Sequence, residues 1–420
     1  MKWRAYPKYK DSGIEWAGKV PEHWEVIRLK YAFVLQRGFD LASDKFIDGC
    51  YPVCASNGII GYHNQWTTAG PSVTVGRSGS VGEVNFIESD FWAHNTALYI
   101  KHFKRMEPRF AYYLLKTVDL KSLSAGTAVG TLNRNYIHDL PIANPVLPEQ
   151  HAIAAFLDRK TTHIDALIAK KERHIELLQE KRAALISHAV TKGLDPTVPM
   201  KDSGVEWLGE IPAHWEMKRL KHIISLVTSG SRGWARYYSE SGDVFLRMGN
   251  LNRDSIDLDL SEIQYVRPPS GTEGERTQVR SNDILISITA YVGTVGLVPN
   301  GLGKAYVNQH TALLRPQHKQ VNARWLAHCI SSTVVQPQFA ITEIGGTKVG
   351  IGLDDLRDIT LVYPPLGEQE DISMHLDSQI SRIARSIAKV QESITTLREY
   401  RTALISAAVT GKIDVRQEAV

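Results

Sequence analysis

Two glycine-rich stretches are the first places in this sequence where nucleotide chemistry could occur. Gly76-Arg77-Ser78-Gly79-Ser80-Val81-Gly82 follows a run of β-forming residues, but it leads into another such run and not into a helix. A dinucleotide-binding loop needs a helix there, because the helix N-terminus binds the pyrophosphate. Gly301-Leu302-Gly303-Lys304-Ala305 has neither the spacing nor the Ser/Thr of a phosphate-binding loop. Neither stretch therefore predicts a nucleotide site.

The residue types that most often perform catalysis are present without a catalytic pattern. The 15 histidines are scattered, and no H-E-x-x-H motif, paired Cys/His group or G-x-S-x-G elbow occurs. His23 and His214 each precede a tryptophan in a repeated stretch, so we expect a structural role for them. The Asn-Pro-Pro-Tyr/Phe motif of amino-methylating enzymes is absent as well. The sequence predicts no catalytic residue, cofactor site or metal site in this chain.

Polar loop residues instead predict recognition of nucleic acid. Loops with Arg, Asn, Ser, Thr and Gly can offer hydrogen bonds to phosphates and base edges. Two Gly-Thr loops, Gly126–Gly130 and Gly346–Gly350, recur in the chain, and glycine permits the close backbone approach that phosphate contacts need. For each single residue, the ordinary alternative is a turn or surface role. The nominated DNA-contacting residues are Asn57, Arg77, Ser78, Asn95, Thr127, Asn133, Arg134, Arg232, Trp234, Arg236, Arg247, Asn250, Tyr291, His310, Thr347 and Lys348.

The elements that would position these residues occur twice. Asp11–Lys30 reads DSGIEWAGKVPEHWEVIRLK and Asp202–Lys221 reads DSGVEWLGEIPAHWEMKRLK, with identical residues at 13 of these 20 positions. Later in each half, Asn144–Gln150 (NPVLPEQ) corresponds to Tyr363–Gln369 (YPPLGEQ). The chain is therefore a tandem duplication, in the order head, variable body, Gly-Thr loop, Pro-x-Leu-x-Glu-Gln joint and long helix.

The long helix is predicted from a stretch that contains neither Pro nor Gly. Glu149–Thr191 and Glu368–Thr410 carry apolar residues at steps of three, four or seven, and both end in Arg-x-Ala-Leu-Ile-Ser-x-Ala-Val-Thr. Forty helical residues extend about 60 Å, so each helix needs a partner, and the two can pack antiparallel. Arg182 and Arg401 interrupt the apolar seam at the same place. Either they snorkel at its edge, which we favour, or they meet a partner's carboxylates. The nominated packing and subunit-docking residues are Ile164, Ile168, Ile175, Leu178, Leu185, Ile383, Ile387, Ile394, Leu397 and Leu404.

The two bodies differ in length but agree in outline. Each has short β-type runs followed by one helix, which predicts a compact α+β domain. The first body has runs at Tyr51–Ile60, Ser72–Val75, Glu83–Ile87 and Thr96–Lys101 and a helix at Pro108–Leu120. The second has runs at Val244–Met248, Ile284–Ile288, Thr294–Val298 and Thr311–Arg315 and a helix at Asn322–Val335. We therefore predict two tandem α/β domains, residues 1–148 and 196–365, followed by long helices in residues 149–195 and 366–420, with pseudo-twofold symmetry.

Composition narrows the class of protein without deciding its function. The 420 residues carry a net charge of +4, which permits nucleic-acid binding without arguing strongly for it. Cys50, Cys54 and Cys329 cannot form a disulfide framework, and we expect buried free thiols in a reducing cytoplasm. The first residues lack the apolar segment of a signal peptide, and no run of about eighteen apolar residues occurs. We expect a cytoplasmic protein that does not cross a membrane.

The paired heads, the Pro-x-Leu-x-Glu-Gln joints and the ALISxAVT helix ends resemble the specificity subunits of bacterial type I restriction-modification systems. The resemblance covers nearly the whole chain. It implies that the bodies are target-recognition domains, each reading one half of a split double-stranded DNA site. It also implies that the helices form an antiparallel coiled coil that sets the spacer. The implied partners are two modification subunits, which methylate adenine with S-adenosylmethionine, and restriction subunits, which use ATP and Mg²⁺ to translocate and cut DNA.

Three other interpretations stay open. A self-contained enzyme would need a methyltransferase or nuclease motif, and we find none. A scaffold that bridges proteins without DNA would not bind random duplex in a salt-dependent manner. A member of the same family that lost its partners or its restriction activity is not distinguishable by sequence. The half-site sequences cannot be read, because base recognition depends on loop geometry.

Overall fold

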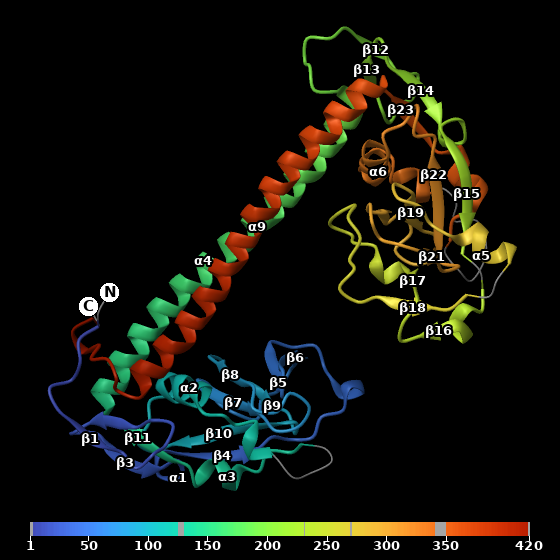
Figure 1. Ribbon diagram of the computed structural model, residues 1–420. Helices are drawn as coiled ribbons and strands as arrows, with labels where there is room; N and C mark the ends of the chain where they lie inside the picture. The colour runs from blue at the N-terminus through green and yellow to red at the C-terminus, as the bar shows by residue number, and fades with distance from the viewer. Residues whose placement is uncertain (1–2, 125–129, 231, 269–270, 341–349, 419–420) are drawn as a thin grey trace. The chain divides into compact units, whose positions relative to one another are not determined.

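The computed structural model describes residues 3–124, 130–230, 232–268, 271–340 and 350–418. The chain forms two units, one of residues 1–172 with 391–420 and the other of residues 173–390. Each unit contains one variable body and part of both long helices, α4 (Leu147–Lys192) and α9 (Leu366–Val409) (Figure 1). The units thus divide both helices near their middle, whereas the domain boundaries predicted above follow chain order and stay a prediction.

The first unit contains two sheets in its body and two two-stranded pairs in its head. The larger sheet has the strand order β4-β10-β7-β8, and the smaller has the order β6-β5-β9 with β5 parallel to β9. In the head, β1 pairs with β2, and β3 pairs with β11 from the end of the body. The elements are β1 (Tyr9–Asp11), β2 (Lys19–Pro21), β3 (Glu25–Arg28), α1 (Leu29–Ala32), β4 (Phe33–Arg37), β5 (Tyr51–Ala55), β6 (Gly58–His63), β7 (Ser72–Gly76), β8 (Val84–Ile87), β9 (Trp92–Ala93), β10 (Ala97–Phe103), α2 (Pro108–Thr117), α3 (Arg134–His138) and β11 (Pro141–Asn144).

The second unit repeats this plan with a longer body. Its larger sheet has the order β15-β22-β19-β20, and a second sheet has the order β16-β18-β17-β21 with β17 parallel to β21. The head hairpin β12-β13 and the pair β14-β23 correspond to those of the first unit. The elements are β12 (Met200–Asp202), β13 (Glu210–Pro212), β14 (Glu216–Arg219), β15 (Ile224–Ser229), β16 (Tyr238–Ser239), β17 (Asp243–Leu246), β18 (Gln264–Val266), α5 (Thr272–Thr277), β19 (Ile284–Ser287), β20 (Val295–Leu297), β21 (Ala305–Val307), β22 (Thr311–Pro316), α6 (Ala323–Ser331), α7 (Pro337–Ala340), α8 (Leu353–Asp358) and β23 (Thr360–Tyr363).

The burial of the central strands explains why they could be predicted from the sequence. Every residue of β7 and of β19 is buried, so these strands appear as short, mainly apolar runs. The predicted strands and helices of the bodies are found, with three corrections. Both body helices end earlier than predicted, α2 at Thr117 and α6 at Ser331, because Val118 and Ser332 have extended backbone. Tyr51–Ile60 is two strands, because the chain turns at Ser56-Asn57 between β5 and β6. Met248 belongs to a 3-10 helix after β17 and not to the strand.

The extra length of the second body lies mainly in one segment. Residues 230–283 separate β15 from β19, whereas residues 38–71 separate the corresponding strands β4 and β7. The rest of the large sheet keeps its register, since the Thr-Ala-Leu sequences at Thr96 and Thr311 lie at the start of β10 and β22. The shared topology therefore tolerates a long insertion at one place.

Each head packs against the C-terminal end of one long helix. The head tryptophans Trp24 and Trp215 are fully buried. In the first unit, Gly411 follows α9 at φ 70°, and a Cβ there would come within 2.3 Å of Pro21 and 3.1 Å of Trp24. In the second unit, Gly193 follows α4 at φ 76°, and a Cβ would come within 3.1 Å of Trp215. A glycine in the left-handed conformation thus ends each helix and brings the chain close to the tryptophan.

The long helices confirm the predicted elements to within two residues at either end. In the first unit, ion pairs join Asp165 to Arg401 at 2.9 Å and Glu172 to Arg398 at 2.9 Å. The numbering rises along α4 as it falls along α9, so the helices run antiparallel. All ten nominated seam residues are buried or half-buried. The favoured interpretation of the seam arginines was wrong, because Arg401 pairs with Asp165 and Arg182 pairs with Asp254 at 2.9 Å.

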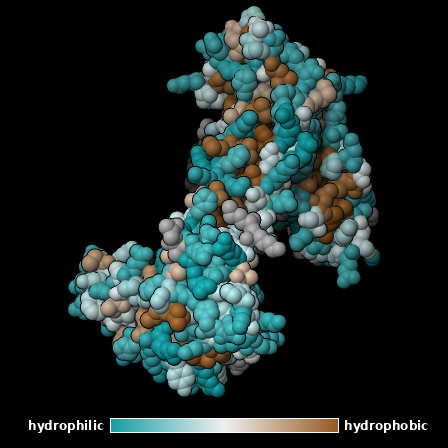
Figure 2. All heavy atoms as spheres, turned by 90° about the vertical axis from the view of Figure 1, so that its left-hand side faces the viewer, coloured by the Kyte–Doolittle hydropathy of each residue, from teal (hydrophilic) through white to brown (hydrophobic). Residues whose placement is uncertain are grey.

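The visible surface is mostly hydrophilic, with scattered apolar patches (Figure 2). Among the described helices, none is long and apolar enough to cross a membrane. Cys54 and Cys329 are buried as predicted, and burial raises the pKa of both thiols to about 12. The prediction was wrong for Cys50, which is exposed.

Candidate nucleic-acid interface and the joints that hold it

The glutamate of each Pro-x-Leu-x-Glu-Gln joint binds the repeated head. Glu149 lies 2.9 Å from His23 Nε2, and Glu368 lies 2.7 Å from His214 Nε2. Glu368 also accepts a hydrogen bond of 2.9 Å from Trp215 Nε1. Since both joints lie at the start of a long helix, a carboxylate there is also favoured by the helix dipole. The histidines therefore connect the head to the helix, as their repeated position suggested.

The glutamine of each joint holds the loop that enters the body's helix. Gln150, fully buried, accepts a hydrogen bond from the backbone N–H of Glu107 at 2.7 Å and donates to the carbonyls of Arg105 and Pro145. Gln369 is also fully buried and accepts from the backbone N–H of Asn322 at 2.9 Å. Glu107 and Asn322 are the N-cap residues of α2 and α6. One buried amide thus fixes the start of each body helix on a long helix.

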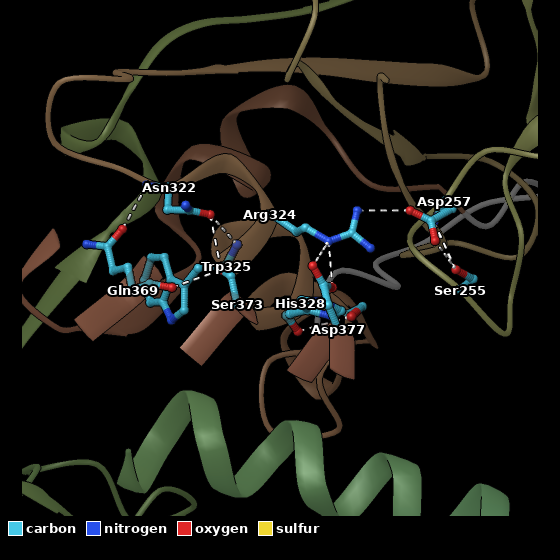
Figure 3. A network of polar contacts seen from close by, with 10 residues as sticks. Ser255, Asp257, Asn322, Arg324, Trp325, His328, Gln369, Ser373 and Asp377 are labelled. Atoms are coloured by element: carbon cyan, nitrogen blue, oxygen red, sulfur yellow. Dashed lines mark hydrogen bonds and ion pairs between the residues drawn. The ribbon is translucent and has the colours of Figure 1, made fainter. Parts of the chain in front are cut away.

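A third repeated contact lies within the first two turns of each body helix (Figure 3 shows the second unit). Arg324 of α6 donates to both oxygens of Asp377 of α9 at 2.6 Å, and His328 Nε2 lies 3.4 Å from the same carboxylate. Partial burial opposes ionisation of Asp377, but hydrogen bonds from His328 and Arg324 hold its pKa below the usual range. In the first unit, Arg109 and Tyr113 of α2 contact Asp158 of α4 in the same way, at 2.8 and 2.6 Å.

An exposed ion triad is also repeated where the head meets the body in each unit. Asp139 accepts hydrogen bonds from Lys30 at 3.1 Å and Arg28 at 3.2 Å. Its pKa is lowered by the hydrogen bond and charge of Lys30 and by Arg28. Asp358 is bound by Lys221 and Arg219 with the same effect on its pKa. Such exposed pairs contribute little to stability. Their recurrence confirms that the repeated parts of the two units, the head, the joint and the long helix, have the same geometry. We call these repeated parts the frame.

In the first body, the structure brings most of the nominated segments together around Thr96. The backbone N–H groups of Arg77 and Ser78 donate to the Thr96 carbonyl at 2.8 and 3.2 Å. Ser56, which precedes Asn57, donates its N–H to Thr96 Oγ1 at 3.2 Å. The segments that carry Asn57, Arg77, Ser78 and Asn95 therefore form one loop cluster.

The segment after the first Gly-Thr loop joins this cluster. Leu132 donates its N–H to the carbonyl of Arg77 at 2.8 Å, and Asn133 and Arg134 follow it in exposed positions. Asn133 is the N-cap of α3, where its side chain accepts from the N–H of Asn135. The loop cluster thus presents arginine, serine and asparagine side chains, which suit contacts to phosphates and base edges.

In the second body, the nominated residues divide into exposed and buried ones. Arg232 and Arg236 are exposed, and Arg247 is half-buried. Tyr291 is 65% exposed in the left-handed conformation, with φ 49°, and the Arg253 guanidinium lies 3.3 Å from its ring centroid. These side chains can reach a ligand outside the domain.

His310 lies at the corresponding loop of the second body. Its Nδ1 lies 3.0 Å from Thr289 Oγ1, and its carbonyl accepts the N–H of Ile288 at 3.0 Å. Ile351, on the far side of the second Gly-Thr loop, donates to the Ile288 carbonyl at 3.0 Å. This repeats the way in which Leu132 returns to Arg77 in the first body.

Two nominated residues belong to the interior. Trp234 is 2% exposed and stacks on Phe245 with ring centroids 5.8 Å apart, inside a cluster with Val266 and Tyr306. Asn250 is 4% exposed and donates its side-chain amide to the carbonyls of two later loop residues, Asp259 and Glu262. Both side chains are held inside the domain and are not available to DNA. Thr127, Thr347 and Lys348 lie outside the described residues.

No group of three or more His, Cys, Asp or Glu side chains that could hold a metal ion occurs among the described residues. The chain matches the family described as "Type I restriction modification DNA specificity domain" twice, over residues 21–177 and 212–396. The chain belongs to this family.

Relatives of the specificity-domain family align with most of the chain. The putative type I restriction enzyme MjaX specificity subunit of Methanocaldococcus jannaschii is 25% identical, over 95% of this chain and 96% of its own length. The type I restriction enzyme EcoBI specificity subunit of Escherichia coli is 24% identical, over 74% of this chain and 67% of its length. The chain is thus similar to these subunits across both copies of its repeat.

Solved structures of type I systems share the fold. One, from a study of complex assembly and conformational transition in a type I R-M system, has a TM-score of 0.71 and 16% identity, covering 93% of this chain and 98% of that one. The HsdS subunit of Thermoanaerobacter tengcongensis has a TM-score of 0.52, also at 16% identity, covering 94% and 98%. This likeness supports two tandem specificity domains with paired long helices.

Sequence reasoning missed the polar residues that join body to frame in this specificity-domain chain. Asp158 and Asp377 lie at the same position of the two helix repeats, and Arg109 and Arg324 lie near the start of the two body helices. A signal for the aspartates was available, because they are identical residues in aligned, mainly divergent sequence. The arginines could be found only once the body helices had been placed.

Proposed function

We propose that this chain is the DNA-recognition subunit of a type I restriction-modification complex, and that each body reads one half of an asymmetric, two-part target. The observation that carries the proposal is the contrast between frame and body. The joints Glu149/Gln150 and Glu368/Gln369 keep the same geometry in both units. The loop clusters they support differ in sequence and length. Two different bodies, each held by the same repeated frame, suit a DNA target whose two halves differ in sequence.

The proposed reading surface of the first body is the loop cluster around Thr96. It presents Asn57, Arg77 and Ser78, with Asn133 and Arg134 beyond the Gly-Thr loop. The side chain of Asn95 instead donates to Asp40, and its Oδ1 is buried. Arginine can bind guanine with two hydrogen bonds, and asparagine can bind adenine in the same way. In the second body we retain Arg232, Arg236, Arg247, Tyr291 and His310 and leave out Trp234 and Asn250, which are buried.

The long helices are proposed to set the distance between the half-sites. α4 has 46 residues and α9 has 44. At ~1.5 Å per residue, each extends roughly 65–70 Å. One helical turn of DNA is ~34 Å, so two recognition domains on the same face of the duplex lie about one turn, or a whole number of turns, apart. Helices of this length are compatible with such a separation. The antiparallel ion pairs Asp165–Arg401 and Glu172–Arg398 support a fixed helix register.

Catalysis is proposed to lie on partner subunits and not on this chain. The modification subunits would methylate adenine with S-adenosylmethionine, and the restriction subunits would use ATP and Mg²⁺ to translocate and cut. Relatives whose names describe them as specificity subunits of type I restriction enzymes support this division of labour. The complex would act on cytoplasmic DNA.

The test is to express the chain with its modification subunits and to map methylated adenines over a genome. We expect one asymmetric two-part sequence with a constant spacer.

Replacing the segment between Trp24 and Gly126 with a related body should change one half-site and leave the other and the spacer unchanged. A one-part target, or a change in both halves, would contradict the proposal. Purified chain alone should bind random duplex more weakly as salt rises and should leave DNA unmodified.

A further inference from the structure

One loop of the second body contacts three different elements within four residues, Asp254 to Asp257. The loop, residues 252–257, lies in the segment that makes the second body longer than the first. Ile256 anchors it: the side chain is 5% exposed, and its carbonyl accepts the N–H of Leu297 in β20 at 2.7 Å. Asp257 also forms an isolated parallel bridge with Leu297. The loop is therefore fixed to the large sheet of its own body.

From this anchor the loop directs one carboxylate at a long helix and one at the arginine by which the body helix α6 binds the other long helix. Asp254 pairs with Arg182 of α4 at 2.9 Å, and Asp257 pairs with Arg324 of α6 at 3.0 Å. Arg324 in turn binds Asp377 of α9, as Figure 3 shows. The loop thus binds α4 directly through Asp254, and through Asp257 it holds the arginine that connects the body to α9.

The same repeated arginine does something else in the first unit. Arg401 corresponds to Arg182 in the helix repeat, but it pairs with Asp165 of α4 and so joins helix to helix. The corresponding body has the shorter segment 38–71 in place of the long one. The ion pair between helix and body at Arg182 is therefore a property of the second body and not of the shared frame.

The second body packs on both long helices through an apolar cluster that includes Val190 and Leu376, but the part of the interface beside the loop is hollow. Loop residues line a cavity of about 430 Å³ together with Arg182, Ile186, His328, Asp377 and Ile380. Where packing is continuous, side-chain contacts fix the orientation of a domain. Across a cavity, the charged contacts at its rim have more influence on that orientation.

We propose that Asp254 and Asp257 are positioning residues that fix the second body on the two long helices, and so determine how strictly the complex selects its spacer. The inference rests on the proposed function, because a spacer has meaning only for a two-part target. It assigns Asp254 and Asp257 a role in distance and orientation, whereas Arg253 of the same loop stacks on Tyr291, a proposed DNA contact. Since surface ion pairs stabilise weakly, the expected effect of losing one is about two- to five-fold in spacer selectivity.

The first measurement is structural and needs no DNA. Spin labels on cysteines introduced at Glu240 and Arg385, both exposed and both in the second unit, report the distance between body and α9. The background is Cys50→Ser, because Cys50 is the exposed native thiol and Cys54 and Cys329 are buried. We expect a broader or shifted distance distribution in Asp254→Asn and Asp257→Asn. The swap Arg182→Asp with Asp254→Arg should restore it. An unchanged distribution in both single variants would overturn the proposal.

The second measurement is functional. The full complex methylates duplexes that carry the mapped target with its natural spacer or with one base pair more or fewer. We expect Asp254→Asn to lower the ratio of natural to altered spacer two- to five-fold, and the charge swap to recover it. Glu176→Gln is the matched control, since it removes an exposed ion pair with Arg173 inside α4.

The outcomes separate the two proposals. Equal loss on all three spacers would mean a merely structural role and would overturn the inference. If the wild-type complex methylates no two-part target, the proposed function fails, and the positioning role in spacer selection fails with it. Broadened distances in that case would show only that the loop fixes the body. A normal two-part target with an unchanged ratio in Asp254→Asn would leave the function intact and remove the inference alone.

Discussion

At the scale of single residues, two fully buried polar side chains lie at the joints between the bodies and the long helices. Gln150 and Gln369 are fully buried amides whose partners are mostly backbone groups at the start of a body helix. A buried donor or acceptor that loses its partner costs about 1–3 kcal/mol. We therefore expect the joint glutamines to contribute strongly to the stability of the chain.

We expect Gln150→Ala to lower the free energy of unfolding by about 2–3 kcal/mol, because it leaves the Glu107 N–H and two carbonyls unpaired in a buried site. Chemical denaturation of the full chain measures this. Gln179→Ala, at an exposed position of the same helix, is the control and should change stability by less than about 0.5 kcal/mol. Equal effects of the two variants would contradict the role of the joint.

A pH dependence follows from Asp377. Its folded pKa lies below the usual range because His328 and Arg324 bind the carboxylate, against the opposing effect of burial. A depressed folded pKa gives stability that is present above the unfolded pKa of ~3.9 and is lost as pH falls through the folded value. Asp377→Asn should therefore lower the thermal midpoint at pH 7, and the difference from wild type should shrink on acidification below about pH 4. Asp371→Asn, an exposed position of the same helix, should show no such trend.

At the scale of elements, sequence predicted what repeats and missed what varies. The helices α4 and α9 were predicted because their apolar spacing lacks Pro and Gly, and strands β7 and β19 because they are buried along their whole length. The small second sheet of each body was harder to predict. Its strands are short and irregular, and Trp234 lies in a 3-10 turn that looks like an exposed loop but fills the interior.

The docking surface for modification subunits needs revision at this scale. Leu404 is 3% exposed and lies inside the first unit, so Leu404→Asp would test folding and not docking. Met374 on α9 is 64% exposed, although it is a large apolar residue on a long helix. Met374→Asp should reduce co-purification of modification subunits at least several-fold without changing the melting temperature of the chain. Ser378→Asp, one turn away and exposed, is the control. Undiminished co-purification would exclude Met374 from the docking surface.

At the scale of the whole molecule, the paired helices are continuous through both units, each of which contains residues of α4 and α9. Changing their length should therefore change the DNA spacer and nothing else. The insertion must keep the 3.5-residue repeat of the apolar seam, so seven residues are the natural unit.

Seven residues inserted after Glu172 and seven after Val390 lengthen the helices by ~10.5 Å, or about three base pairs. We expect methylation mapping to show unchanged half-sites and a spacer about three base pairs longer. The same insertion after Pro196, in an exposed loop, should leave the target as it was. An unchanged spacer in the lengthened protein would contradict the role of the helices.

The backbone-directed bonds of the two joint glutamines also bear on how such a chain can evolve. Gln150 and Gln369 bind amide and carbonyl groups, which every sequence possesses, so the joint does not depend on the identity of most residues in the body it holds. A foreign body that returns its chain to the same place can be accepted without compensating changes in the frame. Gene segments bounded by the head and the joint are therefore natural units of recombination, and under the proposed function one such exchange would replace one half-site.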